Sequence, residues 1–359
     1  MKPSLVSLAN LVILLALTTR PASGQEVRCW GLNDFGACDP PMSLGGTVKV
    51  CGGRYHSMAL TIGGIVRCWG RDLEGQCDVP ADLAPAKAVA AGLFHSVALE
   101  VSGSVRCWGG GMYGQNPCNV PPDLEEISGI AAGADLTASV DLDGTVRTWG
   151  TFGSSPTNSG AFTSVACGYY HTTALTSSGG VQSWGWNAWG NCDTPADLGT
   201  VSEIAAGGWH NVALLPSGEV RCWGLNASGE CDTPAGLLPA TAVASGSSHT
   251  VALQQDGTVR CWGGNYNGEL DTPLGLGRVI AIGAGEYHTI VVLEYVAESC
   301  EESGDFDLDG VIGPSDLSVL LLDFGPCRIC PQDLDRDGSV TVGDIALLLL
   351  NFGPCSLID

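Results

Sequence analysis

The sequence predicts a mainly β protein: a closed seven-bladed β-propeller followed by a small α domain with a duplicated calcium-binding loop and helix. Three observations predict this fold. A Val-x-x-Trp-Gly block occurs seven times, at spacings of 39, 39, 41, 35, 39 and 39 residues. A Gly-x-x-His block alternates with it, and two acidic loops near the C-terminus each precede an apolar segment. A fixed period of about 40 residues with short strand-like blocks is typical of radial β arrays.

Both blocks recur in phase along the chain. The tryptophans of the first block are Trp30, Trp69, Trp108, Trp149, Trp184, Trp223 and Trp262. The histidines of the second block are His56, His95, His171, His210, His249 and His288, which are all the histidines of the chain, and Leu136 fills the seventh slot. Six histidines at one repeat position indicate a scaffold role rather than catalysis or metal binding.

Residues 1–24 have the pattern of a secretory signal peptide. Lys2 provides a positive start, Leu5 to Leu17 are an apolar run, and small residues precede Gln25. A membrane anchor is the alternative, but the apolar run is shorter than the roughly 20 residues that a span needs. We therefore expect an exported protein, secreted or attached to a cell surface and cleaved near Gly24.

Charge and cysteine content agree with export. The formal net charge is −23, and it becomes −25 without Lys2 and Arg20, because 13 basic residues then face 38 acidic ones. Nucleic acids and anionic membranes need basic patches, so we expect no nucleic-acid partner and no membrane insertion. The 16 cysteines suit a compartment that oxidises thiols.

One repeat reads as four short strands, which is one propeller blade. In the fifth repeat these are residues 201–206, 211–215, 219–223 and 230–232, separated by Gly, Pro and Asn turn signals. The mature chain begins at the third strand of a blade (27–31) and leaves after first and second strands (279–282 and 288–293). We predict a propeller domain over 25–296, closed when two strands from each terminus form the seventh blade.

These blocks resemble the repeats of the regulator of chromosome condensation (RCC1) family. The block Cys-Asp-Thr-Pro-Ala-x-Leu, at 192–198 and 231–237, is similar to secreted bacterial members such as a propeller inhibitor of β-lactamases. The resemblance covers residues 27–293 and implies the propeller fold. It implies little about function, because the family includes a nucleotide-exchange factor, an inhibitor and proteins of unknown role.

No catalytic constellation stands outside the repeat register. The acidic residues that follow the repeated cysteines recur like the histidines, and we interpret them as turn or cap formers: Asp39, Asp78, Asp193, Asp232 and Asp271. The fourth unit breaks the repetition at Asp135-Leu136 and in the loop 151–158, either by degeneration or for a function. We predict that the protein is not an enzyme.

Four repeats carry a cysteine before the tryptophan and a second one nine or eleven residues later. Facing positions of an antiparallel hairpin lie within disulfide reach. The predicted bridges are Cys29–Cys38, Cys68–Cys77, Cys107–Cys118 and Cys222–Cys231. Four other cysteines have no partner within their repeats and are interpreted as buried thiols: Cys51, Cys167, Cys192 and Cys261.

The C-terminal region changes in composition after a linker at 297–303. Oxygen ligands at loop positions 1, 3, 5, 7 and 12, with glycine at position 6, are the ligand pattern of EF-hand-type Ca²⁺ sites. The first set is Asp305, Asp307, Asp309, Val311 (backbone) and Asp316; the second is Asp333, Asp335, Asp337, Ser339 (backbone) and Asp344. Mg²⁺ suits such a cage less well, because it gives up its water reluctantly. We expect two Ca²⁺ per chain.

Aspartate at position 12 and one helix after each loop resemble the type I dockerin. The Phe-Gly-Pro-Cys endings at 324–327 and 352–355 are similar to its Gly-Cys variety, and the resemblance covers 304–355 of a domain at 304–359. It implies calcium-dependent docking to a cohesin-like scaffold or surface protein. Surplus apolar residues of the expected helices are partner-face candidates: Val319, Leu322, Leu347 and Leu350.

Each half of this module has one cysteine before its loop and one after its helix. Four cysteines allow three pairings. We predict that each half closes on itself, through Cys300–Cys327 and Cys330–Cys355.

Three functions agree with these features. The first is an exported, non-catalytic binding protein whose propeller recognises an unknown protein or glycan. The second is an enzyme of polysaccharide breakdown, which requires carboxylates outside the repeat register to meet in one pocket. Its candidates are Asp34, Asp72, Glu74 and Asp135. The third is a secreted protein inhibitor.

Overall fold

The computed structural model describes residues 26–294 except 42–43, 45, 112–115, 125 and 152–160, together with four two-residue strands nearer the C-terminus. The predicted signal peptide (1–24), the linker (297–303), the expected helices with their partner-face residues, and the four terminal cysteines lie outside the described residues. So do the predicted Ca²⁺ ligands apart from Val311 and Ser339.

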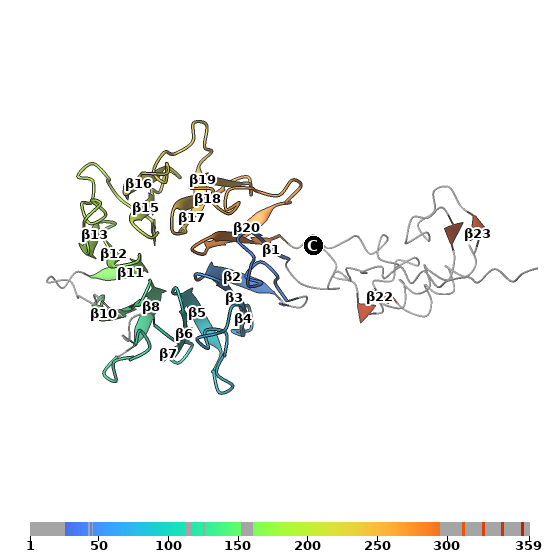
Figure 1. The fold of residues 1–359 in the computed structure, drawn as a ribbon, viewed down its shortest axis with the longest axis horizontal. Helices are drawn as coiled ribbons and strands as arrows, with labels where there is room; N and C mark the ends of the chain where they lie inside the picture. Colours follow the sequence, from blue (N-terminus) through green and yellow to red (C-terminus); the bar gives the residue numbers. More distant parts are fainter. Residues whose placement is uncertain are drawn as a thin grey trace, which may run out of the picture.

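Seven three-stranded antiparallel sheets stand around a common centre (Figure 1). Their strand orders are β1-β21-β20, β2-β3-β4, β5-β6-β7, β8-β9-β10, β11-β12-β13, β14-β15-β16 and β17-β18-β19. The strands β2, β5, β8, β11, β14, β17 and β20 lie innermost, next to the centre of the array. We call them the first strands of their sheets, and the strand that pairs with each of them is the middle strand. The described residues include no helix.

The strands have the following bounds. The first ten strands along the chain are β1 Val27–Gly31, β2 Thr47–Gly52, β3 His56–Thr61, β4 Val66–Gly70, β5 Ala86–Ala91, β6 His95–Glu100, β7 Val105–Gly109, β8 Ile127–Ala132, β9 Leu136–Asp141 and β10 Val146–Gly150. The next eleven are β11 Phe162–Cys167, β12 His171–Thr176, β13 Val181–Gly185, β14 Glu203–Ala206, β15 His210–Leu214, β16 Val220–Gly224, β17 Ala240–Ser245, β18 His249–Gln254, β19 Val259–Gly263, β20 Val279–Ala284 and β21 His288–Leu293.

The prediction of a fourth strand in each blade is wrong. The segment around Cys231 forms a turn. Its backbone is satisfied by a side chain: the Cys231 N–H donates to Asn226 Oδ1 at 2.8 Å, and Asn226 Nδ2 donates to Asp232 Oδ1 at 2.8 Å. The same asparagine–aspartate pairing recurs at Asp39, Asp193 and Asp271. These aspartates are therefore turn formers, as expected, and an amide satisfied in this way needs no fourth strand.

The N-terminal strand completes the sheet formed by the last two strands of the array. β1 pairs antiparallel with β21, with Val27 opposite Val292 and Gly31 opposite His288. One strand from the N-terminus therefore joins two from the C-terminus, instead of two and two. The neighbouring sheet packs against this one through a shared apolar cluster that includes Val50, Trp69 and Ile290.

Each repeated tryptophan packs against the preceding sheet. The Trp69 ring lies in a cluster with Val27 and Ile290, and its indole N–H donates to the Ala37 carbonyl at 2.8 Å. The same indole bond to a turn carbonyl recurs at Trp30, Trp108, Trp149 and Trp223. A large apolar side chain with one satisfied donor thus joins neighbouring sheets at the same place in each repeat.

The histidines form a second set of links between sheets. Each Nε2 lies next to a side-chain oxygen at the start of the next sheet's middle strand: His288 to Ser57 (3.0 Å), His56 to Ser96 (3.2 Å), His95 to Thr137 (3.1 Å), His171 to Asn211 (3.1 Å), His210 to Thr250 (3.1 Å) and His249 to Thr289 (3.1 Å). Thr250 Oγ1 in turn donates to the Glu230 carbonyl at 2.9 Å. The hydroxyl must therefore accept from the imidazole, which fixes a neutral ring protonated at Nε2.

Burial keeps these histidines neutral. Desolvation lowers the pKa of His56, His95, His210 and His288 from 6.5 to about 3, and that of His171 and His249 to about 4. The predicted scaffold role is what the geometry provides. Leu136 interrupts the series, and there the contact with the next sheet is an apolar cluster containing Phe162 and Val165.

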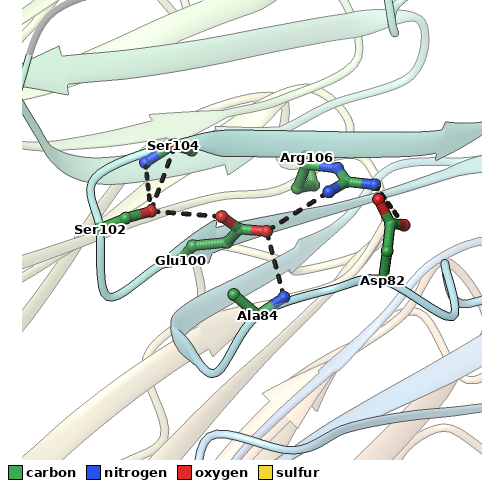
Figure 2. A network of polar contacts seen from close by, with 6 residues as sticks. All are labelled: Asp82, Ala84, Glu100, Ser102, Ser104 and Arg106. Carbon is green, nitrogen blue, oxygen red and sulfur yellow. Dashed lines mark hydrogen bonds and ion pairs between the residues drawn. The ribbon is translucent and has the colours of Figure 1, made fainter.

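Exposed ion pairs repeat along the third strands of three sheets, and Figure 2 shows the pair of Arg106. Arg106 Nη2 lies 2.8 Å from Asp82 Oδ1, and Arg106 Nη1 lies 3.5 Å from Glu100 Oε1, which also accepts the Ala84 N–H. Arg147 pairs with Asp123 and Arg221 with Asp197 in the same way. Because these aspartates are largely exposed, each pair contributes little to stability.

The four short C-terminal strands pair reciprocally. β22 (Val311–Ile312) pairs with β25 (Gly353–Pro354), and β23 (Gly325–Pro326) pairs with β24 (Ser339–Val340). Position 7 of each predicted calcium loop thus joins the Gly-Pro segment of the other repeat.

Candidate functional site: an aromatic face and an axial cavity

One face of the array is built from two kinds of loop. The first is the Gly-x-x-His turn between the first and middle strands of a sheet. The second is the loop that follows the Trp-Gly block. Backbone bonds hold the two together, such as Arg71 N–H to the Tyr55 carbonyl at 2.9 Å and Trp186 N–H to the Tyr170 carbonyl at 2.8 Å. We call this surface the His-turn face.

Aromatic side chains gather on the His-turn face. The residues of its turns and loops include Phe35, Tyr55, Phe94, Tyr169, Tyr170, Trp186, Trp189, Trp209, Tyr266 and Tyr287. Apart from the repeated tryptophans, Phe162 is the one described aromatic residue elsewhere, and it is buried between sheets. Phe35, Trp189 and Tyr266 are 47%, 53% and 73% exposed. These aromatic residues thus lie in turns and loops, and they do not belong to the apolar positions of the strands that form the core.

Two arginines stack within the aromatic cluster. The Arg54 guanidinium lies 5.1 Å from the Tyr55 ring centroid and 5.6 Å from that of Phe94. Arg71 lies 5.3 Å from the Phe94 centroid and 5.7 Å from that of Phe35. These distances are within the range of cation–π attraction. Arg71 also pairs with Glu74 at 2.6 Å, so its charge is compensated.

A polar cluster lies where the His-turn face meets the centre of the array. Arg54 Nε lies 3.2 Å from Glu286 Oε2, and the Tyr169 hydroxyl donates to Glu286 Oε1 at 2.6 Å. Ser247 Oγ lies 2.8 Å from the same hydroxyl. Burial lowers the pKa of Arg54, but the charge of Glu286 together with the hydroxyl groups of Tyr55 and Tyr287 outweighs this effect, and the pKa lies above its usual value. Burial and Glu286 raise the pKa of Tyr169. Residues from four sheets meet here.

A cavity of about 300 Å³ runs between the innermost strands. Most of its wall is small and apolar, with glycine or alanine at many positions of the first strands. Small side chains at the crowded centre were expected from the sequence. The wall also includes the thiols Cys51 and Cys167, and the charged residues Lys49, Glu203 and Glu286.

Glu203 is the most perturbed carboxyl group of the cavity wall. Burial raises its pKa from 4.5 to about 7, against the opposing effects of a backbone hydrogen bond at Val243 and the charge of Lys49. A shifted carboxyl group in a cavity is a candidate for function, although structural groups also shift.

The predicted bridges of the array are present. Cys29–Cys38, Cys68–Cys77, Cys107–Cys118 and Cys222–Cys231 are disulfides with Cα–Cα distances of 4.9 to 5.0 Å. Cys51, Cys167, Cys192 and Cys261 are free thiols; Cys167 is buried, whereas the other three are partly exposed, so the prediction of buried thiols is wrong for them. Desolvation raises the pKa of Cys51 and Cys192 to about 11 and that of the other two to about 12. Thiols with raised pKa are weak nucleophiles at neutral pH.

The four candidate carboxylates of a hydrolase do not meet in a pocket. Asp72 Oδ1 accepts the Cys77 N–H at 2.7 Å, and Glu74 pairs with Arg71. Asp34 is exposed on the loop after β1, and Asp135 is buried in the turn between β8 and β9. None of them lines the axial cavity. Within the described ranges, no group of three or more His, Cys, Asp or Glu side chains is placed to hold a metal ion.

Sequence reasoning missed the aromatic face and the charged pair of the cavity. Both become visible when the repeats are aligned residue by residue: aromatic residues recur two positions after the conserved turn glycine, and charge appears four positions before it. The described part of the chain has no helix that is both long and apolar enough for a membrane span.

Comparison with known proteins identifies the repeat. The model of the regulator of chromosome condensation (RCC1) repeat matches residues 47–76, 86–115, 162–191, 201–230 and 240–269. The search of curated proteins gives no significant match.

Solved propellers share this architecture. The chain is similar to Prp20p from Saccharomyces cerevisiae, at 19% identity over 79% of this chain and 94% of that one, with a TM-score of 0.68. It is similar to yeast RCC1 (Prp20) bound to Kap60, at 18% identity over 86% and 100% of the two chains, with a TM-score of 0.65. The ectodomain of the Arabidopsis thaliana receptor kinase ACR4 has 21% identity over 69% and 93%, with a TM-score of 0.58. The chain therefore carries RCC1 repeats, and its fold is similar to that of the RCC1 propellers.

Proposed function

We propose that this chain is an exported, non-catalytic binding protein whose closed seven-bladed propeller recognises a protein partner through the His-turn face. The observation that carries the proposal is the concentration of aromatic and arginine side chains on that face. Tyrosine, tryptophan and arginine are enriched among the residues that dominate the energetics of protein interfaces, because they bury a large area in well-packed, desolvated contacts.

Charge favours a protein over a nucleic acid as the partner. The two arginines of the cluster are paired with Glu74 and Glu286, and the chain has a net charge of −23. Few uncompensated cations remain for phosphate groups. Two structural relatives have protein partners: Prp20p has been studied for binding to Gsp1p and histones, and yeast RCC1 has been solved with Kap60 bound.

Export is supported by the disulfides. Four bridges in one array are expected where thiols are oxidised, and they agree with the signal-peptide pattern of residues 1–24. If the protein is exported, its partner lies outside the cell, on a scaffold or a cell surface.

We propose further that residues 304–359 form a dockerin-like module that binds two Ca²⁺ and docks to a cohesin-like partner. The two loops of the sequence supply the ligands. Reciprocal pairing of β22 with β25 and of β23 with β24 supports a duplicated module, because the corresponding segments of the two repeats exchange partners. Docking would attach the propeller to a surface without using the His-turn face.

Capture of partners from the source organism's culture medium tests the proposal. The immobilised protein is compared with two matched variants: Phe35→Ala/Trp189→Ala on the His-turn face, and Ile62→Ala/Leu142→Ala on the β-turns at the opposite face, where both side chains are exposed. Captures are repeated with a chelator to remove calcium-dependent docking. We expect a partner that survives the chelator and is lost in the first variant alone. A set of partners captured equally by both variants contradicts the proposal.

A further inference from the structure

One repeat position of the innermost strands, which we call the ring, breaks the small-residue pattern twice, and the two exceptions line the axial cavity. The seven positions are structurally equivalent, because each one pairs with the corresponding Leu or Val of the middle strand in its own sheet. They are Lys49, Ala88, Gly129, Ser164, Glu203, Ala242 and Ala281. Five are small and uncharged, whereas the other two carry opposite charges.

The two charges lie across the cavity from each other. Lys49 is on β2 and Glu203 is on β14, and both line the cavity wall. Going round the array, two sheets separate them on one side and three on the other (Figure 1). No ion pair joins them among the described residues, although the positive charge of Lys49 lowers the pKa of Glu203 against the larger effect of burial. The cavity thus keeps two opposite charges apart.

Neither charge is compensated by another ionic partner. The ammonium of Lys49 has no recorded hydrogen bond or ion pair within residues 26–294 as the structure describes them, and Glu203 has no cationic partner there. The Glu203 carboxyl group is half-buried and bonded to the backbone of Val243. Taking a carboxylate from water without a counter-ion costs free energy, so its place in the wall calls for a function.

The cavity opens at the ring of Lys49 and Glu203. Its other end, at the His-turn face, holds the polar cluster of Arg54, Tyr169 and Glu286. Lys49 is exposed, so solutes reach the ring from the face opposite the His-turn face. The volume of about 300 Å³ matches small-molecule sites.

We propose that this ring binds a small zwitterion, with its carboxylate on Lys49 and its ammonium on Glu203. Such a ligand neutralises both wall charges at once, whereas a ligand with one charge leaves the other uncompensated. The site is separate from the His-turn face.

Calorimetry with the full chain tests the site. The probes are ω-amino acids of increasing length, glycine, 4-aminobutyrate and 6-aminohexanoate, compared with butyrate and butylamine. We expect one length to bind in the millimolar range or tighter, and the two single-charge compounds to bind at least about tenfold more weakly. Failure of every zwitterion to bind at high millimolar concentration, or equal binding of the single-charge compounds, overturns the proposal.

Charge exchange makes the test specific. Lys49→Glu and Glu203→Lys should each abolish binding, because each leaves two like charges in the ring. The double variant should restore binding with the ligand reversed. Lys87→Gln is the matched control, since Lys87 lies on β5, where its ammonium donates to the Ile127 carbonyl at 3.1 Å. Thermal melts verify folding. A single variant that binds like the wild type, or a folded double variant that does not bind, contradicts the proposal.

Discussion

Single side chains in this protein act mainly through their neighbours in the next sheet. Thr250 is fully buried and joins two elements: it accepts from His210 and donates to the Glu230 carbonyl. Removing its hydroxyl leaves the buried Glu230 carbonyl without this donor, and it removes one of the two acceptors of the His210 N–H, the other being Ser245 Oγ at 2.8 Å. Leaving a buried polar group unpaired costs more than the net value of a hydrogen bond.

Thr250→Val should therefore lower the free energy of unfolding by about 1–3 kcal/mol. Thr241→Val is the control, because Thr241 is exposed and its hydroxyl makes one 3.3 Å bond to Leu253. We expect a change within about 0.5 kcal/mol there. Urea denaturation measures both, and equal effects of the two substitutions would show that the link carries no stability.

The glycine of the Gly-x-x-His turn is required by the histidine that follows it. A Cβ atom at Gly53 would overlap the His56 ring and the Gly92 carbonyl, both of which are held in place. Gly63 faces open space, with the Thr61 hydroxyl 3.9 Å from its Cβ position. Gly53→Ala should cost roughly 3 kcal/mol, and Gly63→Ala far less. Similar melting temperatures for the two variants would contradict this reading.

At the scale of elements, the disulfides hold the turns that replace the fourth strands. Cys68→Ala/Cys77→Ala opens a loop of nine residues and should lower stability by about 2–3 kcal/mol. The turn around Asp193 lacks a bridge, because Ser183 stands where the bridged repeats have the first cysteine, so that Cys192 has no partner there. Peptide mapping of the Cys68→Ala/Cys77→Ala variant should find the three other bridges of the array. Free thiols at Cys68 and Cys77 in the wild-type protein would refute the pairing.

The C-terminal module makes a second prediction at this scale. Each loop brings several carboxylates together, and their repulsion without a cation opposes the ordered state. Asp309→Ala and Asp337→Ala should each remove one of two Ca²⁺ binding events in calorimetry of the full chain, while the melting of the propeller stays unchanged. No calcium uptake by the wild-type chain at millimolar concentration would refute the assignment.

The whole array should lose stability in mild acid. Unfolding raises the pKa of six buried histidines from about 3 or 4 to the ordinary 6.5. The unfolded chain therefore binds more protons below pH 6.5, so the free energy of unfolding is highest above that pH and falls as the pH decreases toward 4. Each histidine contributes up to about 1.4 kcal/mol per pH unit in this window.

Urea denaturation at a series of pH values measures this slope. His249→Gln should reduce the proton uptake on unfolding by about one, which gives an internal calibration. Constant stability between pH 6.5 and pH 5 would show that the histidines are protonated in the folded protein.

The repeat period predicted the number of blades, the four bridges between residues 29 and 231 and the scaffold role of the histidines, because each of these recurs in phase. The fourth strand was predicted wrongly, since strand-like spacing around Cys231 does not reveal that Asn226 satisfies the local backbone. The functional surfaces were missed for a different reason. Tyr55 and its aromatic counterparts lie in turns, where the strand pattern says nothing about which side chains gather on one face. Lys49 and Glu203 differ from the small residues at the equivalent positions, and only the folded array shows that both line one cavity.

The central claim is that the His-turn face contacts the partner. A photo-reactive benzoylphenylalanine placed at Trp189, on that face, is compared with one placed at Ile62, which is 83% exposed on the opposite side. Both proteins are irradiated in the source organism's culture medium with a chelator present, and covalent adducts are identified by mass spectrometry. We predict a defined protein adduct from position 189 and none from position 62. The same adduct from position 62 alone, or from both positions equally, would contradict the account.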